Sequence, residues 1–174
     1  MQDIIIIGIT GVGKTTVGKI IAEKLNKSFI DLDKNIESNC GVDVQTIFSI
    51  EGESGFRIRE TNELKRILGA ENDYVLSLGG GCVLKAENRD IIAHSNNLVV
   101  QLCADINVLV DRLAYSASKR PLFNNSDVES KVTELYQERQ ELYDSITDLK
   151  VNTSNLRPVQ VAELVVDKII HKKY

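Results

Sequence analysis

The stretch DIIIIGITGVGKTTVGKIIAEKL, residues 3–25, decides how this chain folds. Its four consecutive isoleucines, Ile4–Ile7, are too few to cross a membrane and are typical of a strand that is buried on both faces of a sheet. From Val17 onward, apolar residues recur at the spacing of a helix. Residues 8–16 lie between the two and match the pattern G-x-x-x-x-G-K-[ST]. The sequence therefore predicts a central strand, a glycine-rich loop and a helix in direct succession.

This glycine-rich loop has the composition of a polyphosphate site. Glycines leave the backbone bare, so that several N–H groups can point at one ligand, and the helix that follows begins with unpaired N–H groups at the positive end of its dipole. Lys14 can then reach the β- and γ-phosphates, the Thr15 hydroxyl can ligate Mg²⁺, and Thr16 can donate to the α-phosphate. An ordinary glycine-rich turn is the alternative, but the preceding strand and following helix favour phosphate binding. The nucleotide contacts expected in the loop are Gly11, Val12, Gly13, Lys14, Thr15 and Thr16.

Length and composition limit the class of protein. With 174 residues, 43% of them hydrophobic and 26% charged, we expect one domain over residues 1–174. The net charge of −4 argues against a general nucleic-acid binder, because no overall field attracts a phosphate backbone. We find no membrane-spanning run, no signal peptide and no interface patch, so we expect a cytoplasmic protein without membrane contact, monomeric by default. The widely spaced Cys40, Cys82 and Cys103 suggest neither a disulfide framework nor a zinc site.

Short apolar segments alternate with helical patterns along the chain. We expect strands at residues 4–8, 28–31, 74–78, 98–103 and 149–152. We expect helices at residues 14–25, 44–50, 53–68, 87–94, 106–114, 127–143 and 158–171. This alternation predicts an α/β fold whose parallel sheet is covered on both faces and binds ligands beyond the carboxyl ends of its strands. Polar or glycine-rich residues gather at three of those ends, in residues 8–16, 31–33 and 77–81.

Asp31 and Asp33 follow the second expected strand and share one face of an extended segment. For such a pair taken alone, we favour the simple interpretation that one of them caps the short helix that follows. Beside a phosphate loop, a carboxylate has two further uses. It can hold a water molecule of Mg²⁺, or it can accept the proton of a hydroxyl group that receives a phosphoryl group.

The segment GESGFRIRE, residues 52–60, also has two interpretations. Arg57 and Glu60 lie three residues apart on an expected helix, which favours a solvent-exposed ion pair, and the nearby Arg59 makes a merely charged surface more plausible. Against this, the planar fork of arginine is the preferred group for bidentate recognition of a carboxylate. Arg57 is therefore a candidate for binding an acidic substrate.

The segment SLGGG, residues 77–81, is more unusual. Three successive glycines directly after a buried strand allow another molecule to touch the backbone, and a plain tight turn seldom needs three. Ser77, at the end of the strand, could bond a metal-bound water, although a serine in a strand more often has a local partner. This segment is a candidate binding surface.

Two further arginines become candidates beside a phosphate loop. Residues 114–126, AYSASKRPLFNNS, are rich in small and polar residues and predict a mobile loop, a functional lid or a disordered segment, from which Arg120 could close over a phosphoryl group. Arg139 and Tyr143 share one face of an expected helix. Each arginine alone is most often a surface residue.

Taken in order, these motifs resemble those of the shikimate kinase family. The resemblance runs from Ile4 to about Ile170. It covers the phosphate loop, D-x-D at residues 31–33, G-E-x-x-F-R-x-x-E at residues 52–60, the triple glycine, R-P-L at residues 120–122 and R-x-x-x-Y at residues 139–143. Many nucleotide hydrolases share the phosphate loop, whereas the ordered set of the other five motifs is specific. Phe123 departs from the leucine that is common at its position in the lid.

The resemblance implies a reaction and a fold. The reaction is ATP-dependent phosphorylation of the 3-hydroxyl of shikimate, with one Mg²⁺ ion, in the biosynthesis of chorismate and aromatic amino acids. The fold is a three-layer P-loop kinase fold, similar to nucleoside monophosphate kinases, with a five-stranded parallel sheet of order 2-3-1-4-5. A shikimate-binding segment is implied at about residues 32–60 and a lid at about residues 113–126.

The resemblance also implies roles for single residues. Asp33 lies nearest the 3-hydroxyl as a base or an orienting group, while Lys14 and Arg120 neutralise charge on the phosphoryl group. The implied shikimate contacts are Asp33, Arg57, Gly79, Gly80, Gly81 and Arg139. Mg²⁺ is implied at Thr15, with Asp31 and Ser77 reaching it through water, and the adenine is implied between Arg112 and the segment that ends at Arg157.

Three alternatives stay open at this point. A gluconate-type sugar acid kinase shares the phosphate loop but predicts neither the paired D-x-D and F-R-x-x-E motifs nor the triple glycine. A nucleotide-switched binding module of the GTPase kind needs a guanine-reading N-K-x-D motif, and Asn26 and Lys27 follow a helix and lack the aspartate. An idle homologue that serves as a scaffold is disfavoured because every candidate catalytic position is filled.

Overall fold

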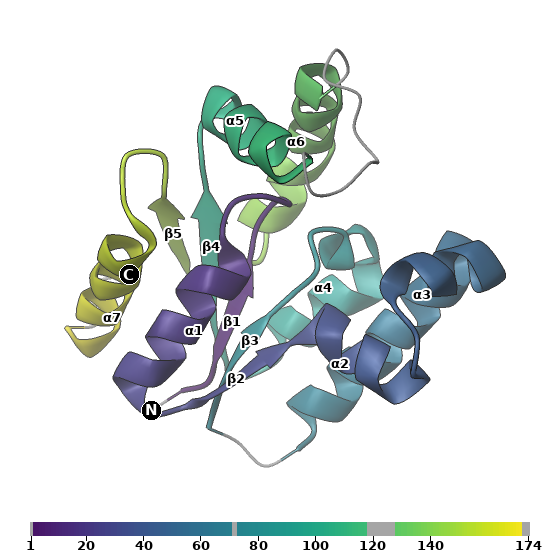
Figure 1. Cartoon of the computed structure of the whole chain (residues 1–174). Helices are drawn as coiled ribbons and strands as arrows, with labels where there is room; N and C mark the ends of the chain where they lie inside the picture. Colours follow the sequence, from purple (N-terminus) through teal and green to yellow (C-terminus); the bar gives the residue numbers. More distant parts are fainter. Residues whose placement is uncertain (1, 71–72, 118–127, 172–174) are drawn as a thin grey trace.

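The structure, a computed structural model, describes residues 2–70, 73–117 and 128–171 (Figure 1). Its sheet has five parallel strands in the order β2-β3-β1-β4-β5, which confirms the predicted fold class and strand order. The strands are β1 (Ile4–Ile7), β2 (Ser28–Asp31), β3 (Tyr74–Ser77), β4 (Leu98–Cys103) and β5 (Leu149–Asn152). All five lie where the apolar segments predict them.

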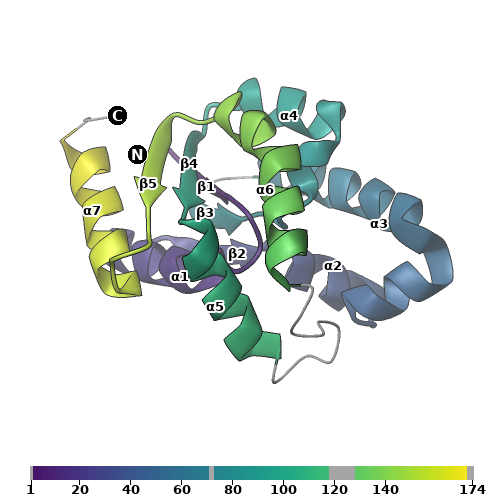
Figure 2. The same ribbon diagram turned by 90° about the horizontal axis from the view of Figure 1, so that it is seen from above.

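Helices cover both faces of this sheet, so that the molecule has three layers. They are α1 (Lys14–Leu25), α2 (Leu32–Cys40), α3 (Val44–Leu68), α4 (Ala86–Ala93), α5 (Ile106–Ala117), α6 (Val128–Asp144) and α7 (Pro158–Ile170), with the short 3₁₀ helix η1 (Cys82–Leu84). Helices α1 and α7 pack together on one face, and α3 and α4 lie on the other (Figure 2). None of the described helices is both long and apolar enough to span a bilayer.

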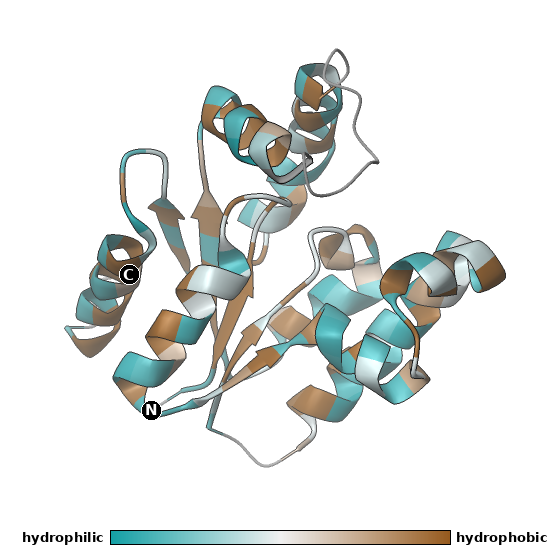
Figure 3. Ribbon diagram, viewed as in Figure 1, coloured by the Kyte–Doolittle hydropathy of each residue, from teal (hydrophilic) through white to brown (hydrophobic). Residues whose placement is uncertain are grey.

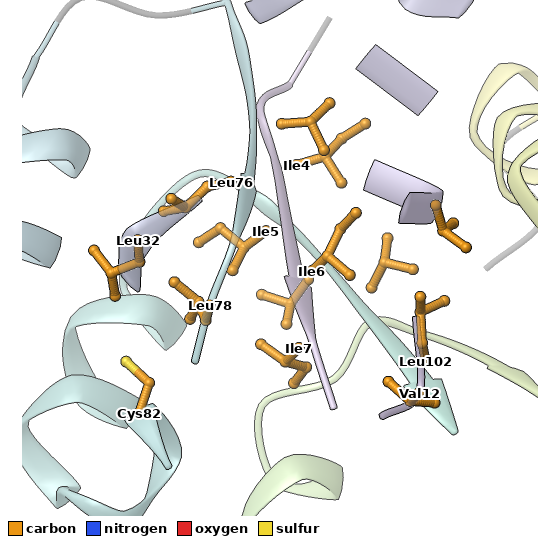
Figure 4. Close-up of a cluster of buried hydrophobic side chains, with 14 of the residues drawn as sticks. Ile4, Ile5, Ile6, Ile7, Val12, Leu32, Leu76, Leu78, Cys82 and Leu102 are labelled. Atoms are coloured by element: carbon orange, nitrogen blue, oxygen red, sulfur yellow. The ribbon is translucent and has the colours of Figure 1, made fainter. Parts of the chain in front are cut away.

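The isoleucine run forms the centre of the core, as its composition predicts. Ile4, Ile5 and Ile6 are fully buried and Ile7 is 1% exposed, because β1 has a paired strand on each side and helices on both faces. In Figure 4 the run packs beside side chains of β3, β4 and the phosphate loop. In Figure 3 the central strands are mostly brown, that is hydrophobic, whereas the outer helices have mixed colours.

Two helices differ from the prediction in their detail. Residues 44–50 and 53–68 were expected as separate helices, and α3 runs through both, but Gly52 has a non-helical conformation with φ of 69° exactly where the break is expected. Helix α2 is the short helix after β2, and its N-cap is Asp31, whose carboxylate accepts from Lys34 N–H at 3.3 Å. The capping interpretation therefore applies to Asp31 and not to Asp33.

The expected lid, residues 113–126, is described only in part. Helix α5 extends to Ala117, beyond the expected end at Ala114, because the small residues there continue the helical pattern. Residues 118–127, which include Arg120, lie outside the described residues.

Candidate active site

A cleft of about 1180 Å³ opens at the carboxyl ends of the central strands, where the sequence predicts ligands to bind. Its walls come mainly from the phosphate loop, the end of β2 with the start of α2, and the triple glycine, and Arg112 of α5 adds to them. The lining residues include Gly11, Gly13, Lys14, Thr15, Thr16, Asp31, Asp33, Ser77, Gly79, Gly80 and Arg112. Most of the predicted phosphate-loop residues and the predicted metal residues thus line one cleft with Asp33, Gly79 and Gly80. Arg57, Gly81 and Arg139 are not among the residues that line it.

The phosphate loop depends on glycine at specific positions. Gly11 and Gly13 have φ of 86° and 100°, a region that other residues rarely adopt. Lys14 Nζ donates to the carbonyl oxygens of Gly8 at 2.7 Å and Ile9 at 3.1 Å, so its ammonium group lies inside the loop. Burial lowers the pKa of Lys14 to about 8, against the raising effects of Asp33 and Asp31. A half-buried cation at the start of α1 is suited to binding a phosphate anion.

A hydroxyl group and a carboxylate are hydrogen-bonded at the N-terminus of α1. Thr15 Oγ1 donates to Asp31 Oδ2 at 2.8 Å, and Asp31 is the register partner of Ser77 in the adjacent strand. These oxygen atoms are the ligand type that Mg²⁺ prefers, directly or through water. The three residues that the sequence assigns to the metal are thus neighbours, and their chemistry fits the ion.

Asp33 is half-buried beside the triple glycine, and its buried Oδ1 atom is not paired. Its Oδ1 atom has no hydrogen-bond partner among the described residues, which is unusual for a buried carboxylate oxygen. Burial and the nearby charge of Asp31 raise the pKa of Asp33, against the lowering effects of Lys14 and Arg57. A Cβ atom placed on Gly79 would lie 2.7 Å from Asp33 Oδ1, so the glycine leaves the space that this carboxylate needs. Asp33 also lines the cleft, so its carboxylate is a candidate acceptor for a substrate hydroxyl.

Arg57 is held by two acidic residues on its own helix. Its Nη1 atom pairs with Glu60 Oε2 at 2.8 Å and its Nη2 atom with Glu53 Oε1 at 3.0 Å. Glu60 is fully buried, so the prediction of a solvent-exposed pair with Arg57 is wrong. Burial tends to lower the pKa of Arg57, but the charges of Glu60 and Glu53 outweigh it and the pKa is raised. The guanidinium group lies so close to Gly81 that a Cβ atom there would collide with it.

Arg139 and Tyr143 reach the same triple glycine from α6. Arg139 Nη1 donates to the Gly80 carbonyl at 3.2 Å, and the Tyr143 hydroxyl donates to the same oxygen at 2.6 Å. Gly80 and Gly81 are consecutive, so the structure brings the guanidinium groups of Arg57 and Arg139 to one short backbone segment. Their helices, α3 and α6, are separated in the chain by β3, η1, α4, β4 and α5.

Arg112 lies on the nucleotide side of the cleft. It donates to Thr153 Oγ1 at 3.0 Å and to the Thr153 carbonyl at 2.9 Å, and a longer bond of 3.4 Å reaches the Val12 carbonyl in the phosphate loop. The guanidinium group therefore bridges the phosphate loop and the segment after β5. Arg157, the N-cap residue of α7, is exposed at the far end of that segment.

Two residues of this site were not assigned to it from the sequence. Glu60 was interpreted as half of a surface pair, and only the packing of α3 against the triple glycine shows that it is buried. Thr153 was part of a segment expected near the adenine, and no local pattern marked its side chain. Its 2% exposure and its bonds to Arg112 are visible only in the folded chain.

Comparisons with known proteins identify the family of this chain. The family model of shikimate kinase matches residues 10–171 of the chain. The shikimate kinase of Marinomonas sp. (strain MWYL1) is 42% identical over 168 residues, which cover 96% of this chain and 91% of that protein.

Solved structures extend the similarity to three dimensions. A shikimate kinase from Acinetobacter baumannii in complex with shikimate matches with a TM-score of 0.90 and 32% identity, over 99% of this chain and 95% of that one. A gluconokinase from Sinorhizobium meliloti 1021 matches with a TM-score of 0.52 and 17% identity, over 99% and 98% of the two chains, which is a likeness of fold alone. This chain belongs to the shikimate kinase family.

Proposed function

We propose that the cleft between the phosphate loop and the triple glycine is where this chain phosphorylates shikimate. In this reaction the 3-hydroxyl oxygen of shikimate bonds to the γ-phosphorus of ATP, the bond from that phosphorus to the β–γ bridging oxygen breaks, and ADP leaves. The observation that carries the assignment of the acceptor site is the approach of Arg57 and Arg139 to one glycine segment beside the half-buried Asp33. Two guanidinium groups and a carboxylate match an acceptor with one carboxylate and several hydroxyl groups.

On the nucleotide side, the phosphate loop and Lys14 bind the triphosphate. Lys14 donates to loop carbonyls in this structure, and the same ammonium group would turn to the β- and γ-phosphate oxygens when ATP is present. Gly11, Val12, Gly13, Thr15 and Thr16 supply backbone N–H groups and hydroxyl donors. Arg112 would stack on one face of the adenine, and the segment that ends at Arg157 would lie against the other face. The bonds to Thr153 hold the Arg112 guanidinium group in a fixed plane.

On the acceptor side, Arg57 and Arg139 bind the carboxylate of shikimate, and the ring hydroxyl groups contact Asp33 and the backbone of Gly79, Gly80 and Gly81. The unpaired Asp33 Oδ1 atom is available to the 3-hydroxyl. Phosphoryl transfer is largely dissociative, so orienting this hydroxyl and neutralising charge matter more than full removal of its proton. Asp33 holds the hydroxyl and takes its proton as the new bond forms.

Mg²⁺ would be held by the Thr15 hydroxyl, with Asp31 and Ser77 reaching it through water molecules. The bond between Thr15 and Asp31 already places these oxygen atoms together. When bound, the ion would neutralise charge on the phosphate groups of ATP. Arg120, outside the described residues, is proposed to add a second cation at the phosphoryl group from the lid. The proposal further takes the chain as one kinase domain, monomeric and cytoplasmic.

A coupled assay of ADP release tests the activity and its rivals. We expect turnover with shikimate, and only background turnover with gluconate or with no acceptor. ADP release that does not depend on shikimate would reject the proposal.

Paired arginine variants test the acceptor site. Arg57→Ala removes a guanidinium group from the triple glycine, so we expect the KM for shikimate to rise at least tenfold, as the loss of a charged hydrogen bond of about 1.5–3 kcal/mol predicts. Arg59→Ala is the matched control, because Arg59 is on the same helix and pairs with Glu51 at the surface. Equal effects of the two substitutions would count against the assignment.

A further inference from the structure

The middle carbonyl of the triple glycine is held by side chains and not by the backbone. The carbonyl of Gly79 accepts from Cys82 N–H at 3.1 Å, and the carbonyl of Gly81 accepts from Leu84 N–H at 3.0 Å, so η1 fixes both of these. The carbonyl of Gly80 accepts instead from Tyr143 and Arg139 on α6. Glycine has more backbone freedom than any other residue, so the direction of this middle peptide depends on its two donors.

The same peptide lies between both arginines of the acceptor site. The Gly80 carbonyl and the Gly81 N–H belong to one planar unit, so turning the carbonyl turns the N–H as well. Gly81 packs against the guanidinium group of Arg57. On the opposite side, a Cβ atom on Gly80 would lie 2.9 Å from Thr10 Oγ1 in the phosphate loop. A rotation of this peptide would therefore disturb the surface that shikimate is proposed to contact.

The two donors differ in what else they must do. Arg139 has a second task, since under the proposed function its guanidinium group binds the carboxylate of shikimate. The bond from Arg139 to the carbonyl is 3.2 Å long, whereas the bond from Tyr143 is 2.6 Å. Tyr143 is 3% exposed, and its phenol ring is buried with the hydroxyl directed at the glycine segment. Burial raises the pKa of Tyr143, so its hydroxyl keeps the proton that it donates.

We propose that Tyr143 is a positioning residue of the acceptor site. Its hydroxyl group holds the Gly80 carbonyl and fixes the Gly80–Gly81 peptide, so that the Arg139 guanidinium group, which shares this carbonyl, can turn to the acceptor carboxylate without leaving the carbonyl unpaired. Without this hydroxyl, Arg139 is the remaining side-chain donor to the partly buried Gly80 carbonyl. The carbonyl then competes with the carboxylate of shikimate for the Arg139 guanidinium group. This inference rests on the proposed function of the cleft.

The test is Tyr143→Phe, which removes the hydroxyl group and keeps the ring. We expect the KM for shikimate to rise about tenfold, the scale of one lost hydrogen bond, while the KM for ATP changes by less than about twofold. Tyr136→Phe is the matched control, because it removes a hydroxyl group from the same helix two turns away, and it should leave both constants unchanged. In an Arg139→Lys background, the effect of Tyr143→Phe on the KM for shikimate should shrink, because the two residues act through one carbonyl.

A second readout separates positioning from a purely structural role. We expect Tyr143→Phe to reduce the rise in Tm that saturating shikimate produces, which can be measured even for a destabilised variant. A variant with a lower Tm but an undiminished shikimate-induced rise and a wild-type KM for shikimate would overturn the inference. Fully additive effects with Arg139→Lys would overturn it too. If the unaltered chain shows no shikimate-dependent turnover, the proposed function itself is rejected. Failure of the proposed function can therefore be told apart from failure of the inference about Tyr143.

Discussion

Replacing Gly79 by alanine tests whether the half-buried carboxylate and the triple glycine form one acceptor site. The added Cβ atom would lie 2.7 Å from Asp33 Oδ1, 3.1 Å from Asp33 Oδ2 and 3.2 Å from Glu60 Oε1. Gly79 is not among the glycines with positive φ, so alanine can adopt its backbone conformation. The effect of this substitution therefore comes from the contact with Asp33 and not from backbone strain.

The size of the effect follows from these distances. A carbon–oxygen separation of 2.7 Å is well inside ordinary contact, so the Asp33 carboxylate must rotate away from Gly79. A rotation of about 30° from a rotamer costs on the order of 0.5–1.5 kcal/mol, which the fold can tolerate. The reaction is more sensitive, because a positioned acid–base group contributes roughly 10²–10⁴-fold to the rate. We expect kcat/KM for shikimate to fall about 100-fold, with little loss of Tm.

The assay measures shikimate-dependent ADP release together with the Kd of a fluorescent ATP analogue. We expect the Kd to stay within about twofold of the wild-type value, because the three atoms nearest to the added methyl group belong to Asp33 and Glu60 and not to the phosphate loop. Gly69→Ala is the control, since Gly69 ends α3 with a negative φ and is remote from the cleft. A Gly79→Ala variant with a wild-type kcat/KM for shikimate would refute the reasoning.

Four further perturbations address other parts of the molecule. Asp33→Asn should lower kcat at least 100-fold while the nucleotide still binds, and near-normal turnover would reject its role. Because burial lowers the pKa of Lys14 to about 8, its ammonium group loses its charge above that pH, and kcat/KM for ATP should fall above about pH 8. A kcat/KM for ATP that stays constant up to about pH 10 would contradict this role of Lys14. Thr153→Val removes one of the hydrogen bonds that hold the Arg112 guanidinium group and should raise the KM for ATP about fivefold, with Thr153→Ser as the control; an equal rise in the KM for shikimate would count against it. Ile5→Ala should lower the free energy of unfolding in urea by about 2–5 kcal/mol, and a loss below about 0.5 kcal/mol would mean that the strand is less tightly packed than the structure shows.

Much of this fold could be predicted from the sequence, because its elements have strong local patterns. The isoleucine run, the glycine-rich loop and the first helix follow one another without interruption, and the strand positions agree with the structure. Helix α2 was expected only as a short helix of undefined length. Leu32 and Ile36 are its only two fully buried residues, so its apolar periodicity is weak. The break in α3 was visible from Gly52, because glycine is the residue suited to a positive φ.

Many of the residues that the sequence singles out line one cleft, whereas the contacts between side chains were less predictable. The residue types of the phosphate loop, Asp33 and the triple glycine already indicate phosphate, hydroxyl and backbone contacts. The burial of Glu60 could not be predicted, because an i,i+3 pair has the same pattern on an exposed and on a buried helix face. The bond from Tyr143 to Gly80 joins residues 63 positions apart, and no local pattern encodes such a contact.

The most direct measurement is a crystal structure of this chain with shikimate and a non-hydrolysable ATP analogue. We expect nitrogen atoms of both Arg57 and Arg139 at about 2.7–2.9 Å from the carboxylate oxygens of shikimate, with the 3-hydroxyl group against Asp33. Shikimate bound with its carboxylate away from both guanidinium groups, or outside the cleft at the triple glycine, would contradict the proposed acceptor site.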